Sequence, residues 1–418
     1  MNLDNHKVLL LGIDKKEEWS LTDSLAELAE LAKTAGLSVA GEVTQVRTAP
    51  HYKYYLGSGK IRELPPLLKD QDIQIVITDD ELTPSQQKAL EEILVVKIID
   101  RTQLILDIFA VRAKTHEAQL QVELAQLEYM FPRLTRMWTH LSKLGGGIGT
   151  RGPGEKQLEV DKRQIRKRII LIKKELKSVK KHRHTTRAKR QNIPLLTGAL
   201  VGYTNAGKST LMNLLTKASV LVENKLFATL DPTTRKVILP DNSEILITDT
   251  VGFIKKLPHQ LVTSFHSTLE EVQEADFLIH VLDVSHPKFE ILLQTSGELL
   301  QELNTSDKPC LLILNKLDQA QANLPALKLF LEHQKNYLVI SALDPEYLPL
   351  ILNKINQLLA HYYDVRTYHI PYQRMDIVDL LHTKAQVLHE EYQDQEIVLK
   401  VKVNSILGDK LMGALYKK

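Results

Sequence analysis

An eight-residue run near the middle of the chain limits its possible folds more than any other segment: Gly202-Tyr203-Thr204-Asn205-Ala206-Gly207-Lys208-Ser209. The run matches the phosphate-binding pattern G-x-x-x-x-G-K-[ST], in which backbone N–H groups wrap phosphates, the lysine neutralises their charge and the hydroxyl binds magnesium. A β-rich run, Leu195–Val201, leads into it, and a helical pattern, Thr210–Thr216, leads out. This context predicts a P-loop domain with a doubly wound α/β sheet.

Three further motifs follow, each after an apolar run that is typical of a core strand. Asp249-Thr250-Val251-Gly252 closes Glu244–Thr248, where a carboxylate can hold a magnesium-bound water and a glycine N–H can meet a γ-phosphate. Asn315-Lys316-Leu317-Asp318 follows Cys310–Leu314, and the Asp318 carboxylate can accept from the N1–H and 2-amino groups that guanine has and adenine lacks. Ser341-Ala342-Leu343 follows Tyr337–Ile340, where a backbone N–H can support the guanine O6. The order of the motifs predicts binding of GTP and of its product GDP.

The stretch between the first two motifs is expected to complete the site: Phe227-Ala228-Thr229-Leu230-Asp231-Pro232-Thr233-Thr234-Arg235. A threonine whose hydroxyl coordinates magnesium while the γ-phosphate is present must come from here, and we assign that role to Thr229 rather than Thr233. Residues 227–231 are therefore counted among the GTP-binding residues; the alternative is a surface turn around Asp231-Pro232. The catalytic assignments are Lys208, Thr229, Asp249 and Gly252, and the assigned magnesium ligands are Ser209 and Thr229.

Phe253 follows Gly252 at a position where many GTPases carry a glutamine that orients the attacking water. An aromatic ring cannot orient that water. We therefore expect slow intrinsic hydrolysis that a bound partner accelerates.

Positive charge is concentrated in one segment. The chain has a net charge of only +3, but residues 162–190 hold 14 Lys/Arg and a single acid, Glu175, so that this segment is +13 and the rest is −10. A helix face that only improves solubility usually mixes charges of both signs, whereas a surface of one sign repels itself unless a polyanion is near. The segment therefore favours RNA contact over a merely solvated helix face.

The same segment is predicted to form one arm of a helical hairpin. Two apolar stripes at alternating spacings of three and four flank a glycine-rich run, Gly145–Gly154, and can pair as antiparallel helices with that run at an exposed tip. Bare backbone at the tip can approach RNA closely, and Arg151 can contact phosphate or stack on a base; the alternative is a flexible linker. The predicted RNA-binding residues are Gly146, Gly147, Arg151 and Lys156. The stripes are Leu120, Leu124, Leu127, Phe131, Leu134, Trp138 and Leu141, then Ile165, Ile169, Ile172, Leu176 and Val179.

At 418 residues the chain is too long for one ordinary core. We expect an N-terminal α/β domain at 1–110 with a largely parallel sheet, the hairpin at 111–190 with its tip at 145–154, the P-loop GTPase domain at 191–364 and a small α+β domain at 365–418. Lys7–Ile13 and Ile73–Thr78 are the predicted N-terminal strands, and Thr83 is expected to cap a helix that begins at Pro84. The only cysteine, Cys310, excludes an intrachain disulfide and favours a reducing compartment, so we expect a cytoplasmic protein.

Taken together, these residues resemble the HflX family of ribosome-associated GTPases over essentially the whole chain. The resemblance extends to Tyr55-Leu56-Gly57-Ser58-Gly59-Lys60 and Asp80-Glu81-Leu82-Thr83-Pro84-Ser85-Gln86-Gln87, and it is most specific from Gly145 to Glu155 and through Gln157-Leu158-Glu159. It implies binding to the 50S ribosomal subunit and its 23S rRNA near the peptidyl-transferase centre, stimulated hydrolysis, and splitting or rescue of stalled ribosomes. The segment after Val365 resembles an appendage that only some members carry.

Two other functions compete with a ribosome-acting GTPase. The first is an RNA-binding scaffold for ribosome assembly that uses GTP as a structural or timing ligand; the intact Lys208, Ser209 and Asp249 favour an enzyme. The second is a membrane-linked signalling GTPase, but no spanning segment or lipidation motif is found. We expect a monomer without integral membrane association and without a DNA partner.

Overall fold

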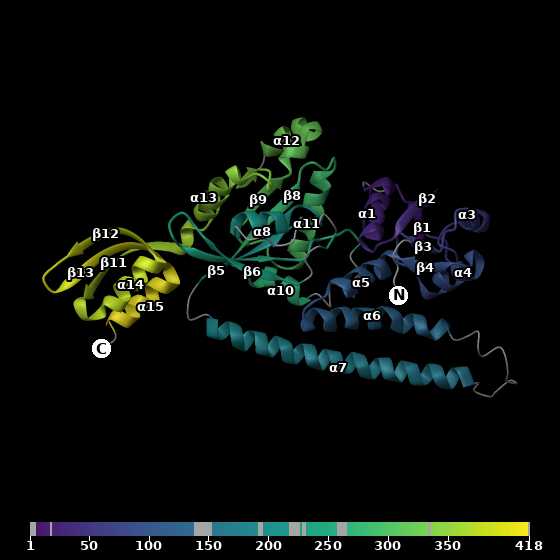
Figure 1. The fold of residues 1–418 in the computed structure, drawn as a ribbon, viewed down its shortest axis with the longest axis horizontal. Helices are drawn as coiled ribbons and strands as arrows, with labels where there is room; N and C mark the ends of the chain where they lie inside the picture. Colours follow the sequence, from purple (N-terminus) through teal and green to yellow (C-terminus); the bar gives the residue numbers. More distant parts are fainter. Residues whose placement is uncertain are drawn as a thin grey trace. The chain divides into compact units, whose positions relative to one another are not determined.

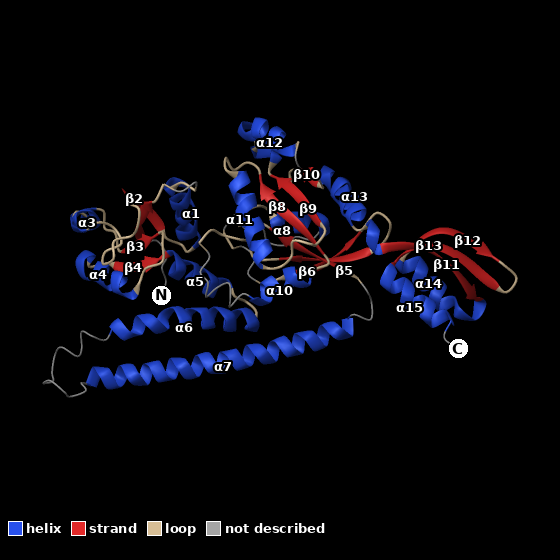
Figure 2. Ribbon diagram, turned by 180° about the vertical axis from the view of Figure 1, so that it is seen from behind, coloured by secondary structure: helices blue, strands red, loops and turns tan. Residues whose placement is uncertain are grey.

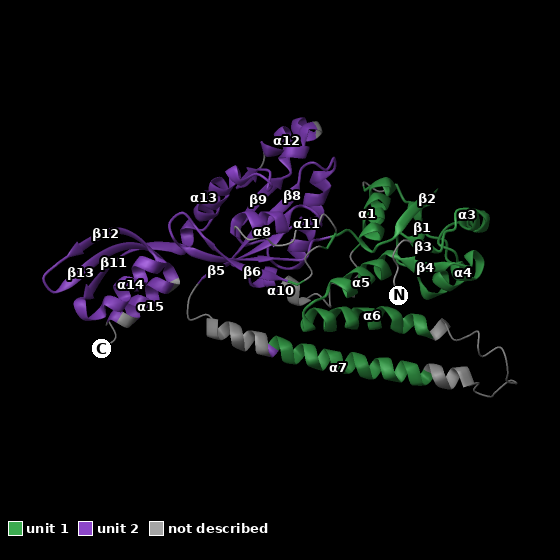
Figure 3. Cartoon of the chain, viewed as in Figure 1, with its two compact units in different colours: residues 1–180, 224–231, 254–266 green, residues 181–223, 232–253, 267–418 purple. Residues whose placement is uncertain are grey.

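The computed structural model of the protein describes residues 6–16, 19–137, 153–190, 195–216, 226–227, 231–256, 266–332 and 336–416. Helices and strands alternate along most of this length (Figures 1 and 2). The chain divides into two compact units (Figure 3): unit 1 comprises residues 1–180, 224–231 and 254–266, and unit 2 comprises residues 181–223, 232–253 and 267–418. The division into four domains stays a prediction. No helix in the described ranges is both long enough and apolar enough to cross a membrane.

Unit 1 is built on a four-stranded sheet whose neighbouring strands are all parallel, which confirms the expected parallel sheet. Its central strand is buried over six consecutive residues, as expected where helices cover both faces of a sheet. The predicted cap is also present, because Thr83 and Gln86 form a reciprocal capping box and a proline opens the helix. In the order β2-β1-β3-β4 the strands are Ser38–Val46, Lys7–Asp14, Ile75–Thr78 and Lys97–Asp100; the helices are α1 (Leu21–Thr34), α2 (Ser58–Arg62), α3 (Leu64–Asp70), α4 (Pro84–Leu94) and α5 (Arg101–Arg112).

The predicted hairpin is formed by α6 (His116–Met137) and α7 (Pro153–Arg190), which lie side by side in both ribbon views (Figures 1 and 2). Residues from the two predicted stripes form a shared apolar cluster: Leu120, Leu124 and Ile172, with Leu127, Ile169 and Leu176 against them. The two arms thus satisfy each other's apolar faces.

Unit 2 is built on a six-stranded sheet in the order β10-β9-β8-β5-β7-β6. The five expected strands are confirmed: β5 (Leu196–Val201), β7 (Glu244–Asp249), β8 (Phe277–Asp283), β9 (Cys310–Asn315) and β10 (Tyr337–Val339). The edge strand β6 (Thr233–Ile238) pairs antiparallel with β7, and its first three residues belong to the predicted switch stretch. The helices are α8 (Lys208–Thr216), α10 (His266–Glu274), α11 (Phe289–Glu302), α12 (Leu324–Leu331) and α13 (Leu348–Leu358), with short 3₁₀ turns η3 (Leu317–Gln319), η4 (Gln321–Asn323), η5 (Pro345–Tyr347) and η6 (Ala360–Tyr362).

The C-terminal part of unit 2 has an antiparallel three-stranded sheet in the order β11-β13-β12, with an apolar core of its own. The predicted α+β character is confirmed. Two lysines on this part, Lys384 and Lys402, pair with Glu244 and Asp241 of the β6–β7 hairpin. The elements are β11 (Tyr363–Pro371), η7 (Tyr372–Arg374), α14 (Met375–Lys384), β12 (Gln386–Tyr392), β13 (Glu396–Asn404) and α15 (Ser405–Tyr416).

Candidate nucleotide site

The phosphate-binding motif forms the turn between β5 and α8, and its two glycines cannot be replaced without strain. Gly202 has φ +141°, and a Cβ there would lie 2.1 Å from the Val281 carbonyl oxygen. Gly207 has φ +95°, and its Cβ would lie 2.2 Å from the Asn315 side-chain nitrogen. Both angles are ones that L side chains rarely adopt. The pattern therefore reflects close backbone packing as well as phosphate geometry.

The Lys208 side chain folds over the same turn. Its Nζ donates to the carbonyl oxygens of Gly202, at 3.0 Å, and Tyr203, at 2.8 Å. Burial lowers the pKa of this ammonium to about 8. Because burial disfavours its charged form, an anion bound in the turn would stabilise that form and would be stabilised in return.

Ser209, in α8, meets Asp249 because β5, which precedes α8, is the neighbour of β7, which ends at Asp249. The parallel register of β5 and β7 sets Leu200 opposite Asp249, so both motifs emerge at the carboxyl edge. The Ser209 hydroxyl donates to Asp249 Oδ2 at 2.7 Å. This pair offers the hard oxygen donors that magnesium prefers.

Phe253 is tied to the phosphate-binding turn through its backbone. Its N–H donates to the Gly202 carbonyl at 3.1 Å, and its own carbonyl accepts from Thr204 N–H at 2.7 Å. The ring is buried, at 4% exposure. A Cβ on Gly252 would lie 2.8 Å from Thr204 Cα, so this turn also needs its glycine. Phe253 thus has a packing role and presents no polar group to a water.

The base-recognition motifs are joined by Asn315. Its Nδ2 donates to the Ala206 carbonyl at 2.8 Å, and its Oδ1 accepts from Ala342 N–H at 2.9 Å. One side chain thereby links three of the four motifs. Lys316, with φ +65°, pairs with Asp283 at 2.6 Å, and the turn that it opens leaves Asp318 exposed. Ser341 and Ala342 are buried, whereas Leu343 is 72% exposed.

The comparisons with known proteins agree with this geometry. Family models match residues 22–110 (GTP-binding GTPase N-terminal), 112–190 (GTP-binding GTPase Middle Region) and 197–316 (50S ribosome-binding GTPase). GTPase HflX from Caldanaerobacter subterraneus subsp. tengcongensis is 43% identical, covering 98% of this chain and 93% of its own. GTPase HflX from Lacrimispora saccharolytica is 45% identical, covering 96% of this chain and 94% of its own. The chain belongs to the HflX family of GTPases.

A solved structure is also similar. It is the crystal structure of a GTP-binding protein from Sulfolobus solfataricus in complex with GDP, which is 27% identical, with a TM-score of 0.45, and covers 85% of this chain and 99% of its own. Like the HflX relatives, this chain is a GTPase.

Two residues of the predicted switch stretch of this HflX-family chain belong to unit 1. The Phe227 ring is buried and contacts Phe109 edge-on, with centroids 4.5 Å apart. The Asp231 carboxylate accepts from the Thr115 hydroxyl and N–H and from Lys114 N–H, just before α6 begins. Both residues were assigned to GTP binding; here they contact the N-terminal elements and the hairpin base.

Several predicted residues lie outside the described ranges. They are Ala228, Thr229 and Leu230 of the switch stretch and Gly146, Gly147 and Arg151 of the tip; Lys156 lies on α7 but its side chain is not described. Their assigned roles stay predictions.

Sequence reasoning missed a buried ionic cluster that involves the segment after Phe253. The Arg101 guanidinium, 1% exposed, donates to Asp79 at 2.9 Å, to Glu27 at 2.5 Å and to the Lys255 carbonyl at 3.2 Å. Lys256 pairs with Asp79 at 2.5 Å and with Asp80 at 2.9 Å. Burial opposes the charge on Arg101, but Glu27 and Asp79 outweigh it and raise its pKa. No short motif marks this cluster, because its members are far apart in sequence.

The two N-terminal segments that resemble HflX signatures contact each other beside this cluster. Tyr55, from the first signature, donates through its hydroxyl to Asp80 of the second, at 2.8 Å. Gln86 of the second donates to the His51 carbonyl, just before the first, at 2.9 Å. The signatures therefore support the segment that holds Lys256.

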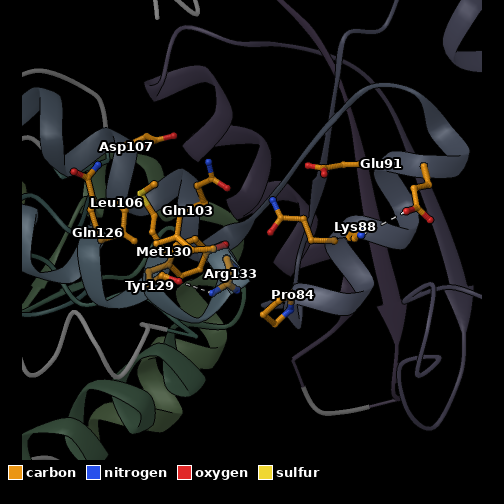
Figure 4. A pocket seen from close by; sticks show the side chains of 13 residues that line it. Pro84, Lys88, Glu91, Gln103, Leu106, Asp107, Gln126, Tyr129, Met130 and Arg133 are labelled. Carbon is orange, nitrogen blue, oxygen red and sulfur yellow. Dashed lines mark hydrogen bonds and ion pairs between the residues drawn. The ribbon is translucent and has the colours of Figure 1, made fainter. Parts of the chain in front are cut away.

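Unit 1 also contains a cavity of about 440 Å³ between α4, α5 and α6 (Figure 4). It shares no residue with the predicted nucleotide site. Its wall mixes amides, charged groups and apolar side chains: Pro84, Gln87, Lys88, Glu91, Glu92, Gln103, Leu106, Asp107, Gln126, Tyr129, Met130, Arg133 and Leu134.

Proposed function

We propose that this GTPase acts on the 50S ribosomal subunit and that its GTP-bound form splits or rescues stalled ribosomes. The observation that supports this most strongly is the convergence of four guanine-nucleotide motifs, three of them linked by Asn315, in a chain that also holds a basic helical hairpin. The match of residues 197–316 to the 50S ribosome-binding GTPase model supports the 50S subunit as the partner.

In the nucleotide site, Lys208 would neutralise the β- and γ-phosphates and Gly252 N–H would meet the γ-phosphate. Ser209 would hold Mg²⁺, and Asp249, 2.7 Å from the Ser209 hydroxyl, would act through a metal-bound water. When bound, Mg²⁺ supplies positive charge against the phosphate oxygens. Thr229 would complete the metal site from the switch stretch. Asp318 would select guanine, because its carboxylate can accept from both donors of the base.

The hairpin would supply the RNA contact. Arg168 pairs with Glu123 and Lys173 with Glu128, so two of the basic residues on α7 bind the other arm. Arg163, Lys167, Lys174 and Lys177 are exposed. Their charge supports binding to the phosphates of 23S rRNA. Further RNA contacts are proposed for Gly146, Gly147, Arg151 and Lys156, at or near the predicted tip. The protein is proposed to act as a monomer.

Arg151→Ala is expected to weaken binding to 50S subunits by about tenfold, the loss of one charge-assisted contact, while leaving GTP affinity unchanged. Sedimentation with separated subunits and a non-hydrolysable GTP analogue measures the first quantity, and calorimetry the second. Arg374→Ala, which removes an exposed arginine from the C-terminal part, is the control. Unaltered 50S affinity in the Arg151 variant would remove the tip from the interface.

Turnover separates the enzyme from the scaffold alternative. A ribosome-acting GTPase should release phosphate over many cycles, faster with 50S subunits than without them. Equal rates with and without subunits would contradict stimulation by the ribosome. A scaffold should give no stimulated release.

We further propose that residues 254–256 relay the nucleotide state to the N-terminal elements of unit 1. They follow directly on Phe253, which is bonded to the phosphate-binding turn, and they are fixed by Arg101, Asp79 and Asp80. A shift of Gly252 and Phe253 toward a γ-phosphate would therefore pull on the N-terminal elements.

Lys256→Ala should lower the 50S-stimulated turnover by on the order of fivefold, a coupling of ordinary size, and leave the intrinsic turnover unchanged. The measured quantity is the ratio of kcat with and without subunits. Lys236→Ala is the matched control. Lys236 also pairs with a carboxylate, that of Glu244, but it lies on the edge strand β6, outside the proposed relay. A ratio equal to that of the wild type would rule the relay out.

A further inference from the structure

The turn between β2 and α2 presents stacked aromatic rings on the surface of unit 1. Tyr52 is 82% exposed, and its ring centroid lies 4.6 Å from that of His51, at an interplanar angle of 30°. The Tyr54 ring centroid lies 5.7 Å from that of His51, with the two rings within 9° of parallel. Lys53 Nζ lies 5.0 Å from the Tyr54 ring centroid. Flat π faces and a cation are thus held together at one place.

The turn is braced by its own backbone and by α4. His51 N–H donates to the Tyr55 carbonyl at 2.7 Å, and Tyr55 N–H donates back at 3.1 Å. The His51 Nδ1 accepts from the N–H groups of Lys53 and Tyr54, both at 3.2 Å, which fixes the orientation of the ring. Gln86 on α4 donates to the His51 carbonyl at 2.9 Å. The backbone of the turn and the His51 ring are therefore ordered before any partner arrives, which reduces the conformational entropy lost on binding.

The sequence around the rings carries positive charge. Residues 43–62 include Arg47, Lys53, Lys60 and Arg62 and no Asp or Glu. Lys53 and Arg62 are exposed. Aromatic faces beside exposed positive charge are the combination that proteins use for single-stranded nucleic acid: bases stack on the rings and phosphates meet the cations. An apolar protein partner would instead meet a charged surface with no described pocket among these residues.

We propose that His51, Lys53 and the tyrosines at 52 and 54 form a stacking platform for an unpaired RNA base. The inference rests on the proposed ribosomal function. It adds a second RNA contact, made by residues that are distant in sequence from the predicted hairpin tip. The base must be unpaired, because a paired base in an A-form helix buries its faces in the stack. We define residues 51–54 as the aromatic platform.

The test uses the full chain with two probes, a twelve-nucleotide single-stranded RNA and separated 50S subunits. The double variant His51→Ala/Tyr52→Ala should bind both at least about fivefold more weakly, the lower limit for loss of one stacked base. Tyr52→Trp should keep the affinity and show fluorescence quenching by the RNA beyond that of the wild type, since indole also stacks. Tyr392→Ala, which removes a tyrosine that is 66% exposed in unit 2, is the matched control.

The outcomes separate the platform from the proposed function. Wild-type affinity of the double variant for both probes would overturn the platform. Weaker 50S binding with unchanged single-strand binding and no quenching would also overturn it, in favour of a protein contact. If the wild type fails to bind 50S subunits but binds the RNA through Tyr52, the platform stands and the ribosomal function fails.

Discussion

Asp318→Asn is expected to raise the Kd for GTP by about a hundredfold or more and to create affinity for XTP, because the base-recognition edge is inverted. The Asp318 carboxylate lies exposed in the turn Leu317–Gln319, after Lys316 in the left-handed region. A carboxylate accepts from both N1–H and the 2-amino group of guanine, whereas an amide can accept only one and directs its own N–H at the other. Xanthine carries an oxygen where guanine carries the amino group, so the amide N–H finds an acceptor.

Competition calorimetry with GTP, XTP and ATP measures the exchange. Asp307→Asn is the control, because Asp307 is also an exposed aspartate of unit 2 but lies outside the four motifs. Unaltered GTP affinity in the Asp318 variant would contradict the assignment of this carboxylate to the base. Equal affinity of the wild type for ATP and GTP would refute guanine selection altogether.

The central strands of both sheets could be predicted because they are buried on both faces and so form continuous apolar runs. β8 (Phe277–Asp283) has the predicted bounds, and the other four expected strands of unit 2 differ at their ends by one residue. The strands that were missed lie at sheet edges. β2 alternates exposed and half-buried residues, β4 has four residues, and β6 exposes three in a row. An edge strand needs less apolar surface, so its sequence resembles that of a loop.

The nucleotide motifs could be predicted because the functional groups of each motif are adjacent in sequence. The cluster around Arg101 could not, because Glu27, Asp79 and Lys256 reach it from separate elements, and only the strand order brings them together. The resemblance to HflX proteins included Tyr55 and Asp80 but gave no physical role for either residue. Their hydrogen bond and the pairing of Asp80 with Lys256 give one: Lys256 counteracts the effect of burial and lowers the pKa of the Asp80 carboxyl.

Arg101→Met should destabilise the protein by about 3–5 kcal/mol, the usual effect of leaving buried charges without their partner. The side chain of Arg101 is 2% exposed, and its partners Glu27 and Asp79 are 10% and 1% exposed. Methionine fills much of the same volume but offers no donor, so both carboxylates lose their guanidinium, and Asp79 keeps the Ser24 hydroxyl and Lys256. Urea unfolding of the full chain, followed by circular dichroism, measures the loss. Arg366→Met, whose side chain is 21% exposed and whose partners Asp364 and Asp409 are more exposed still, should cost about 1 kcal/mol or less.

A triple variant, Glu27→Gln, Asp79→Asn and Arg101→Met, distinguishes buried charge from lost packing. If unpaired carboxylates cause the destabilisation, neutral amides should recover most of it, because no buried charge is left without a partner. If the triple variant is as unstable as Arg101→Met, the arginine stabilises the unit by its shape and hydrogen bonds to Ser24 and Lys255. In the first case the ion pairs also position Lys256, since Asp79 serves both cations. The triple variant should then lose ribosome-stimulated turnover although it folds, which ties the relay to the charges rather than to the fold.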